Sequence, residues 1–510
     1  AILSPFLEHN SNLRSIDLWS FSMDTRSTHL LASALSRRSN KQSLRGFAIL
    51  DSSNMDDESA ETLVDAVAMY CNLKVLSLYF SINAKKWPVI LGKLGSLHKL
   101  EDLTLGHNDI DDEAAAVLAN GLANNNTLKK LSLESNELIT TSGWIAFFVG
   151  LRNFNSLEEL NLSENDIDGE GLKEMANALV NMKELKHLDI GKHLELGYTN
   201  ESISTDEWQT FFNLMRNANH SLEELNLSGN SIDDEAVAAM VDCLANMSSL
   251  KTLHLSSCSH ITTAGWRAFF SSLQNNNSAL EYLNLATNNI GDCTVATMVD
   301  VLANMSSLTE LNLTKISQIT ASGWMRMSNL FQQPNSILEK LYLSSTGNHI
   351  NDEVVIAFAN ALVNNTSLST LQFGNGRVIT ARGWAALSDT LCNKASIDNI
   401  FSSNHTLQEV FWVHVEEHLP GDLASYLRLN ENNNKVEVAR QKILKHHFSN
   451  GESNVEDLVN MDMKVLPRAM SWIGRDVDGF LLLYQVVHSM PTLFDSGSKA
   501  KSVGGKRKRV

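Results

Sequence analysis

Cysteine and proline are both scarce in this chain, with five and six copies among its 510 residues. The cysteines are odd in number and stand far apart, at Cys71, Cys243, Cys258, Cys293 and Cys392. Their spacing argues against a disulfide framework and against a CxxC metal site, which favours a reducing compartment. We therefore predict a cytoplasmic protein that binds no metal and no other cofactor.

Long apolar runs and the common catalytic motifs are also missing. No apolar run approaches the ~20 residues of a membrane-spanning helix, so a membrane is not an expected partner. The sequence has no Walker loop, no GxGxxG after a strand and no nucleophile elbow. The HxxEH motif of some zinc peptidases occurs from His414 to His418, but Pro420 leaves little room for the helix it needs. We therefore expect neither zinc chemistry nor conventional enzymatic activity.

One short pattern recurs through most of the chain. Residues 222–232 read LEELNLSGNSI, and close copies begin at Leu100, Leu128, Leu157 and Leu280. These segments follow the leucine-rich repeat pattern LxxLxLxxN, in which the leucines lie on one side of a short extended segment. A single copy cannot bury its leucines alone, so neighbouring copies must stack.

The spacing of these copies predicts the architecture. Most successive copies from Leu13 to Leu368 begin 27 to 31 residues apart, and a poor match begins at Leu407. This length accommodates one strand and one helix in each unit. We predict an α/β leucine-rich repeat solenoid, a horseshoe with a parallel β-sheet on its concave side and helices on its convex side.

Two types of unit alternate along the chain. The first continues with an acidic helix start, as in IDDE from Ile232. The second continues as in ITTAGW from Ile261, and the aromatic residues Trp266, Phe269 and Phe270 follow at helical spacing. Because this spacing recurs in every second unit, we interpret these aromatic residues as core between neighbouring units and not as a binding stripe.

This alternation of two helical units resembles the ribonuclease-inhibitor-like subfamily of leucine-rich repeat proteins. That subfamily includes Ran GTPase-activating proteins and the sensor regions of NLR receptors, and the resemblance covers about residues 1–415. The variant Cys258-x-x-Ile261-Thr262-x-x-Gly265 is also similar to the cysteine-containing repeats of F-box substrate receptors. Repeats of this kind are specific for the fold and say little about the partner.

Three regions are predicted along the chain. Residues 1–415 form the repeat array, and the segment that ends at Leu13 lacks the polar cap of a solenoid end, so we expect the array to begin upstream of Ala1. Residues 416–495 show apolar residues at helical intervals, as from Val436 to His447, and predict a helical cap or small domain. Residues 496–510 are basic and predicted to be disordered. Within them, Lys506 to Arg509 could direct nuclear import, or the basic tail could fold back on the acidic body.

The residue after the first leucine of each unit alternates in sign. It reads Lys74, Glu101, Lys129, Glu158, Lys186, Glu223, Lys251 and Glu281. Because adjacent parallel strands lie ~4.8 Å apart, we interpret this series as a ladder of charges that neutralise one another. The alternation argues against the single-sign groove of a nucleic-acid-binding protein.

Two places in the chain are candidates for partner contact. Trp19, Leu50 and Tyr79 occupy equivalent positions on three successive strands, with Phe80 beside them, where later units carry small or polar residues. This apolar cluster is either a contact site or a surface that packs on sequence upstream of Ala1. The second place is Tyr198, in an insertion that lengthens one unit and forms a predicted loop on a rigid scaffold.

The sequence as a whole predicts a non-enzymatic scaffold that binds another protein on its concave face and rims. A preformed curved sheet has little ordering cost when it docks, which suits this function. Two alternatives stay open. The resemblance to Ran GTPase-activating proteins implies a regulator of a Ran-like small GTPase, although no residue can be given the catalytic role by motif. The other alternative is the substrate-recognition subunit of a ubiquitin ligase or an immune-type receptor.

Overall fold

The computed structural model describes residues 3–447, apart from 11, 20–22, 39, 53–54, 124, 193–202, 219–220, 274–278, 334–335, 345–348, 375–378 and 412–420. The chain divides into two compact units, Ala1–Ile319 and Thr320–Val510. Tyr198, the HxxEH motif and the basic tail lie outside the described residues. The predicted region boundaries near residues 415 and 495 stay predictions.

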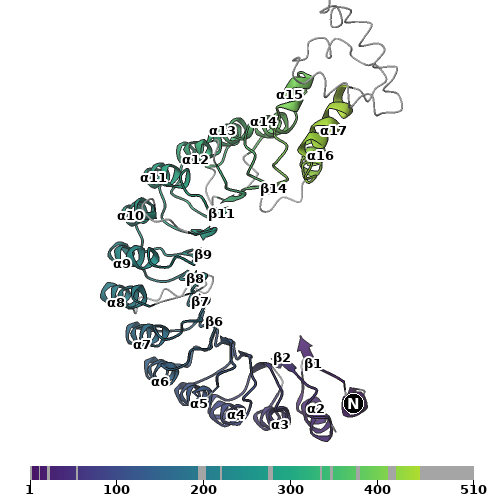
Figure 1. Cartoon of the computed structure of the whole chain (residues 1–510), viewed down its shortest axis with the longest axis vertical. Helices are drawn as coiled ribbons and strands as arrows, with labels where there is room; N and C mark the ends of the chain where they lie inside the picture. Colours follow the sequence, from purple (N-terminus) through teal and green to yellow (C-terminus); the bar gives the residue numbers. More distant parts are fainter. Residues whose placement is uncertain are drawn as a thin grey trace, which may run out of the picture. The chain divides into compact units, whose positions relative to one another are not determined.

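The first unit alternates strands and helices along the chain (Figure 1). Its strands are β1 (Ser15–Trp19), β2 (Gly46–Ser52), β3 (Val75–Phe80), β4 (Asp102–Thr104), β5 (Lys130–Ser132), β6 (Glu159–Asn161), β7 (His187–Asp189), β8 (Glu224–Asn226), β9 (Thr252–His254), β10 (Tyr282–Asn284) and β11 (Glu310–Thr314). Its helices are α1 (Leu3–His9), α2 (Thr25–Arg37), α3 (Asp57–Ala68), η1 (Ala84–Lys86), α4 (Trp87–Leu94), α5 (Asp112–Leu122), α6 (Thr141–Leu151), α7 (Gly169–Leu179), α8 (Thr205–Arg216), α9 (Asp234–Leu244), α10 (Thr263–Leu273) and α11 (Asp292–Leu302). Each strand pairs in parallel with the next, as predicted.

The second unit continues the same alternation, and its last described elements are helices. Its elements are α12 (Ala321–Met327), η3 (Ser328–Gln332), β12 (Lys340–Ser344), α13 (Asp352–Leu362), β13 (Thr370–Phe373), α14 (Ala381–Leu391), α15 (Ile397–Phe401), β14 (Glu409–Phe411), α16 (Gly421–Asn430) and α17 (Lys435–His447). The helical periodicity that begins near Val436 is confirmed by α17.

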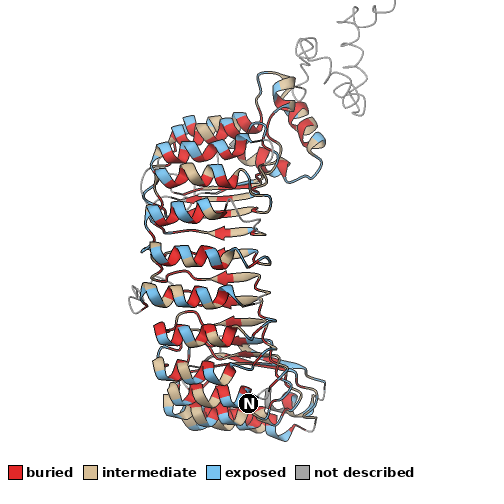
Figure 2. Cartoon of the chain, turned by 60° about the vertical axis from the view of Figure 1, so that its left-hand side comes forward, coloured by how far each residue is buried: buried red, intermediate tan, exposed pale blue. Residues whose placement is uncertain are grey.

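The inner sides of the strands from β2 onwards are apolar and buried, and the buried residues of the helices turn towards them (Figure 2). Leu160 and Leu225 are 1% and 2% exposed. An asparagine that follows several of the strands satisfies the backbone where the chain turns. Asn165 donates through Nδ2 to the carbonyl oxygens of Leu133 and Leu162, each at 2.9 Å, and its Oδ1 accepts the N–H of Asn136 at 2.8 Å. Each such asparagine therefore links its own turn to neighbouring ones.

The residue just before this asparagine position adopts the left-handed backbone conformation. Positive φ angles recur at His107, Ser135, Glu164, Gly229, Ser257, Thr287 and Lys315. Gly229 has φ of +71°, and a Cβ there would lie 2.1 Å from the carbonyl oxygen of Lys192. Other residue types accept the conformation elsewhere, whereas at position 229 only glycine also fits the space.

The two unit types interlock where one helix begins beside the next. Asp112 on α5 accepts the N–H of Thr140 at 2.7 Å and its hydroxyl at 2.6 Å. A Cβ on Gly143 would lie 2.3 Å from the Asp112 carboxylate, so only glycine leaves room for this contact. The same arrangement recurs in Asp234, Thr262 and Gly265, and in Asp352, Thr380 and Gly383.

The aromatic residues of the second unit type form the core between helices, as predicted. Trp144, Phe147 and Phe148 on α6 are fully buried. The Trp144 ring stacks on Phe148 at 5.7 Å and meets Phe147 edge-on at 5.8 Å. Trp208, Phe211 and Phe212 repeat this geometry on α8.

Candidate protein-binding site

The first unit has one sheet face that its helices do not cover, which we call the open face (Figure 1). In the short strands the middle leucine points inward, and the two flanking residues lie on the open face. Two registered rows cross it: Asp102, Lys130, Glu159, His187 and Glu224 form one row, and Thr104, Ser132, Asn161, Asp189 and Asn226 form the other. These rows line a hollow of about 410 Å³ over β4 to β8.

The hollow is acidic. Its lining includes the carboxylates of Asp102, Glu159, Asp189 and Glu224, and Lys130 is its one lysine or arginine. With His187 neutral the formal charge is therefore -4 plus 1, or -3. Lys130 Nζ lies 2.6 Å from Glu159 Oε1, so the cation is already engaged inside the hollow.

The surroundings of Asp102 disfavour its charged form. Burial raises its pKa above the ordinary value, the nearby Lys130 ammonium opposes that rise, and the charge of Glu159 adds to it. A raised pKa means that the surroundings disfavour the charged carboxylate. A cation brought by a partner would therefore relieve a cost that the free protein carries.

Glu224 lies between two imidazole rings. Its Oε2 is 3.0 Å from His187 Nδ1 on β7, and its Oε1 is 3.4 Å from His254 Nε2 on β9. The His254 ring also meets the Tyr282 ring at 5.1 Å and lies within 3.5 Å of Asn284 Nδ2. Both oxygens of one carboxylate in the hollow thus face histidine rings from neighbouring strands.

The predicted ladder of alternating charges lies one residue before the first row of the hollow. Lys129 and Lys186 both reach Glu158, at 2.6 and 2.8 Å, and their hydrogen bonds lower the pKa of Glu158 to about 2. Lys74 pairs with Glu101 at 2.5 Å and Lys251 with Glu223 at 2.7 Å. The interpretation of this ladder as mutual neutralisation is confirmed.

The predicted apolar cluster is only partly formed on the open face. Trp19 on β1 registers with Leu50 on β2, and Leu50 and Tyr79 are half-exposed. The Tyr79 ring lies 5.8 Å from the ring of His107, which is exposed. The side chain of Trp19 lies outside the described residues, and its role stays a prediction.

The inclusion of Phe80 in that cluster is wrong. The strand β3 extends to residue 80, so Phe80 alternates inward with Leu76 and Leu78 and is fully buried. Its ring stacks on Trp87 at 5.8 Å, and its N–H donates to Asn108 Oδ1 at 2.8 Å. Phe80 is therefore part of the core.

The first row of the hollow was not predicted from the sequence. The predicted ladder uses the first variable position of LxxLxLxxN, whereas Asp102, Glu159 and Glu224 stand at the second. The signal was available, because residues two apart in a strand share a face.

The described residues offer neither a metal-binding cluster nor a membrane-spanning helix. Within the part of the chain that the structure describes, His, Cys, Asp and Glu do not gather in a group of three or more that could hold a metal ion. Among the same residues, no helix combines the length and apolar character needed to cross a membrane.

Comparison with known proteins places the repeats. The leucine-rich repeat family model matches residues 96–119, 124–148, 155–176 and 218–241, which contain β4, β5, β6 and β8 of the hollow. Ribonuclease inhibitor of Sus scrofa is 29% identical over 340 residues, 66% of this chain and 71% of that protein. The Mus musculus ribonuclease inhibitor is 28% identical over 342 residues, 66% and 72% of the two chains.

The protein is a ribonuclease-inhibitor-like leucine-rich repeat protein. Protein NLRC5 of Ictalurus punctatus is a further relative of this repeat protein, 33% identical over 138 residues, which cover 27% of this chain and 8% of that one. Among solved structures, a chain of the yeast Rad7 and Elc1 complex shows a TM-score of 0.46 and 20% identity over 71% of this chain and 86% of that chain, a likeness on which we rest no conclusion. The repeats and these relatives indicate a protein-interaction scaffold.

Proposed function

We propose that this repeat protein acts without catalysis and binds a protein partner that presents basic groups to the hollow on its open face. The observation that carries the proposal is the surplus of three negative charges among the hollow's lining residues. Complementary charge guides a partner to such a surface and fixes its orientation.

The state of individual carboxylates supports a basic partner. Asp102 is held charged at a cost, because burial raises its pKa. Asp189 uses Oδ1 to accept the N–H of Gly191 at 2.8 Å. An arginine or lysine from the partner would pair with these carboxylates in a partly desolvated hollow, where an ion pair is stronger than in bulk water.

Trp19, Leu50 and Tyr79 would supply a second contact for the same partner. Leu50 and Tyr79 offer half-exposed apolar surface on β2 and β3, in the same sheet as the hollow. Aromatic residues dominate the energetics of many interfaces, so this cluster would add affinity while the hollow sets charge preference. Tyr198, in the insertion after β7, is a further proposed contact.

The relatives suggest the first partner to test. Two of the relatives are named as inhibitors of ribonuclease, so we propose a ribonuclease as the first candidate partner for this chain. A Ran-like small GTPase and a ubiquitin-ligase or immune-receptor substrate stay as alternatives, and the acidic hollow does not favour either over the other. We propose a cytoplasmic location, with nuclear import through Lys506 to Arg509 as a further prediction.

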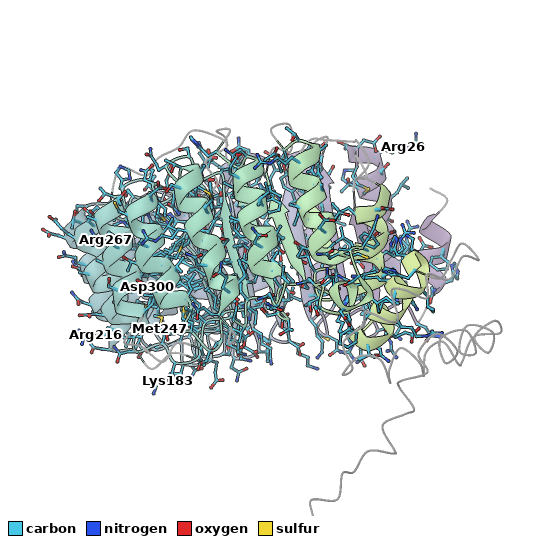
Figure 3. All side chains as sticks on the ribbon, turned by 90° about the horizontal axis from the view of Figure 1, so that it is seen from above. Arg26, Lys183, Arg216, Met247, Arg267 and Asp300 are labelled. Carbon is cyan, nitrogen blue, oxygen red and sulfur yellow. The ribbon has the colours of Figure 1, made fainter. Side chains whose placement is uncertain are left out.

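The test compares two variants that each lose two negative charges. Asp102→Asn with Asp189→Asn alters the hollow, whereas Glu113→Gln with Asp300→Asn alters exposed positions on α5 and α11 (Figure 3 labels Asp300). Each protein is titrated with a purified ribonuclease and used for quantitative capture from a native lysate. We expect the hollow variant to lose binding of its basic partner about tenfold or more, since two charge contacts are removed.

The control variant should bind like the wild type. Equal losses of binding in the two variants would mean that only the net charge of the protein matters, which would contradict a specific site in the hollow. Retention of all partners by the hollow variant would move the binding surface elsewhere. Loss of capture in Trp19→Ala with Tyr79→Ala, without loss of folding, would locate the second contact.

A further inference from the structure

One carboxylate in the hollow, that of Glu224, lies close to two histidine rings, one on each neighbouring strand. Glu224 on β8 is 41% exposed, and the neighbouring strands place His187 and His254 at its two oxygens. The histidine side chains are 44% and 23% exposed, so both can exchange protons with solvent. Their pairing with Glu224 comes from strand register, because His187 is level with Glu224 and His254 is level with Asn226.

We propose that His187 and His254 make partner binding at the hollow depend on pH, with a basic partner held near neutral pH and released under mildly acidic conditions. This inference rests on the proposed function and adds its regulation. It needs no movement of the backbone, because the histidines already lie within reach of the carboxylate that they would neutralise.

The charge change follows from the residues in place. The lining of the hollow carries -3 with His187 neutral, and protonation of His187 changes this to -3 plus 1, or -2. Protonation of His254, which lies outside the lining, adds one more positive charge beside Glu224. Protonated imidazoles would also form charge-assisted hydrogen bonds with Glu224 and engage the oxygens that a partner's cation would otherwise use. Acid therefore weakens binding in two ways: it reduces the negative charge of the hollow, and it engages the Glu224 oxygens in hydrogen bonds to the imidazoles.

The other charged groups near the two histidines support this direction. His187 has Glu159 beside it on β6 and Glu224 beside it on β8, with Lys186 and Asp189 close by on its own strand segment. His254 faces Glu224 on β8, and on β10 it meets Tyr282 and Asn284. Carboxylates thus outnumber cations around the pair, and the carboxylates themselves titrate at lower pH than histidine.

The experiment uses a fluorescently labelled nona-arginine peptide as the basic probe and the full chain. Its dissociation constant is measured by anisotropy at low ionic strength at about pH 7.5 and about pH 5.5, between which histidine gains its proton. We expect the wild-type constant to rise about tenfold at the lower pH, as two added charges in a partly screened site predict. In His187→Asn with His254→Asn, the ratio of the two constants should fall below about twofold, whatever affinity this variant has at neutral pH.

Two comparison variants separate the possible outcomes. His260→Asn removes an exposed histidine outside the hollow and should retain the wild-type pH response. Asp102→Asn with Asp189→Asn should bind the peptide more weakly than the wild type at neutral pH. If it does not, the proposed function fails and the regulation fails with it. If it does, but the wild type binds equally at both pH values or the double histidine variant keeps the full response, the regulation alone is overturned.

Discussion

Two rows of charged side chains cross the sheet of the first unit at adjacent sequence positions, and they differ in how their charges are paired. The ladder row pairs nearly every charge, as where Glu158 meets both Lys129 and Lys186. The hollow row pairs Lys130 with Glu159 but leaves Asp102 partly buried and its charged form disfavoured. The ladder row therefore stabilises the sheet, whereas the hollow row keeps charge that the fold does not need. Such surplus at a cost in stability is typical of functional surfaces.

The largest expected effect separates the inner side of a strand from its open face. Leu225→Asp places a charge in the enclosed core, where Leu225 is 2% exposed, and should cost about 4 kcal/mol or more. Asn226→Asp changes the next residue, which lies on the open face and can still accept the N–H of Ser228. It should cost less than about 1 kcal/mol. Chemical denaturation of both variants measures the difference, and similar losses would mean that the two faces are not distinct.

A smaller effect is expected when the hydrogen bonds of one turn asparagine are removed. Asn165→Ala leaves the N–H of Asn136 and the carbonyl oxygens of Leu133 and Leu162 without this partner, at a cost of about 2–4 kcal/mol. Asn177→Ala is the matched control, because Asn177 lies half-exposed on α7 and makes one long bond to Glu174. That control should change stability by less than about 0.5 kcal/mol. Unfolding midpoints measure the difference between the two variants. If Asn165→Ala leaves the midpoint unchanged, the turn asparagines do not stabilise the fold.

The smallest expected effects distinguish the two charged rows directly. Glu158→Gln should lower the unfolding midpoint at neutral pH, because the pKa of Glu158 is held at about 2, below its ordinary 4.5. A lowered pKa stabilises the folded protein above about pH 4.5, and this stabilisation is lost as the pH falls through about 2. Asp102→Asn should leave the midpoint unchanged or raise it, because the raised pKa of Asp102 destabilises the folded protein at neutral pH.

Thermal unfolding at several pH values checks this pair of variants. The gap between wild type and Glu158→Gln should close in strong acid, and added salt should narrow it at neutral pH. Two variants that both destabilise the protein at neutral pH would show that the hollow row, like the ladder row, serves the fold.

Much of the fold could be predicted from the sequence because repetition supplies many copies of one signal. The leucine spacing predicted which side of each strand is buried, and the spacing of Trp144, Phe147 and Phe148 predicted the core between helices. The helix that begins near Val436 was also predicted from periodicity. Phe80 was misplaced because a strand that runs longer than the repeat pattern turns one more residue inward.

The candidate site was less accessible to sequence analysis than the fold. Its first row depends on which variable positions share a face, and its acidity appears only when Asp102, Glu159 and Glu224 are placed in register. The contact of His187 and His254 with one carboxylate joins residues from three strands, and no local pattern in the sequence signals it. Charge pairing along the ladder was predictable because its alternation of sign is visible in the repeat itself.

The measurement that tests the central claim most directly is site-specific photo-cross-linking. A photoreactive amino acid is placed at Ser132, half-exposed in the hollow, or at Arg267, exposed on α10 (Figure 3). Both proteins are incubated with a native lysate, with and without the Asp102→Asn and Asp189→Asn substitutions. We predict a cross-linked basic protein from Ser132 that disappears in the charge variant and is absent from Arg267. The same protein cross-linked from Arg267 and not from Ser132 would contradict the account.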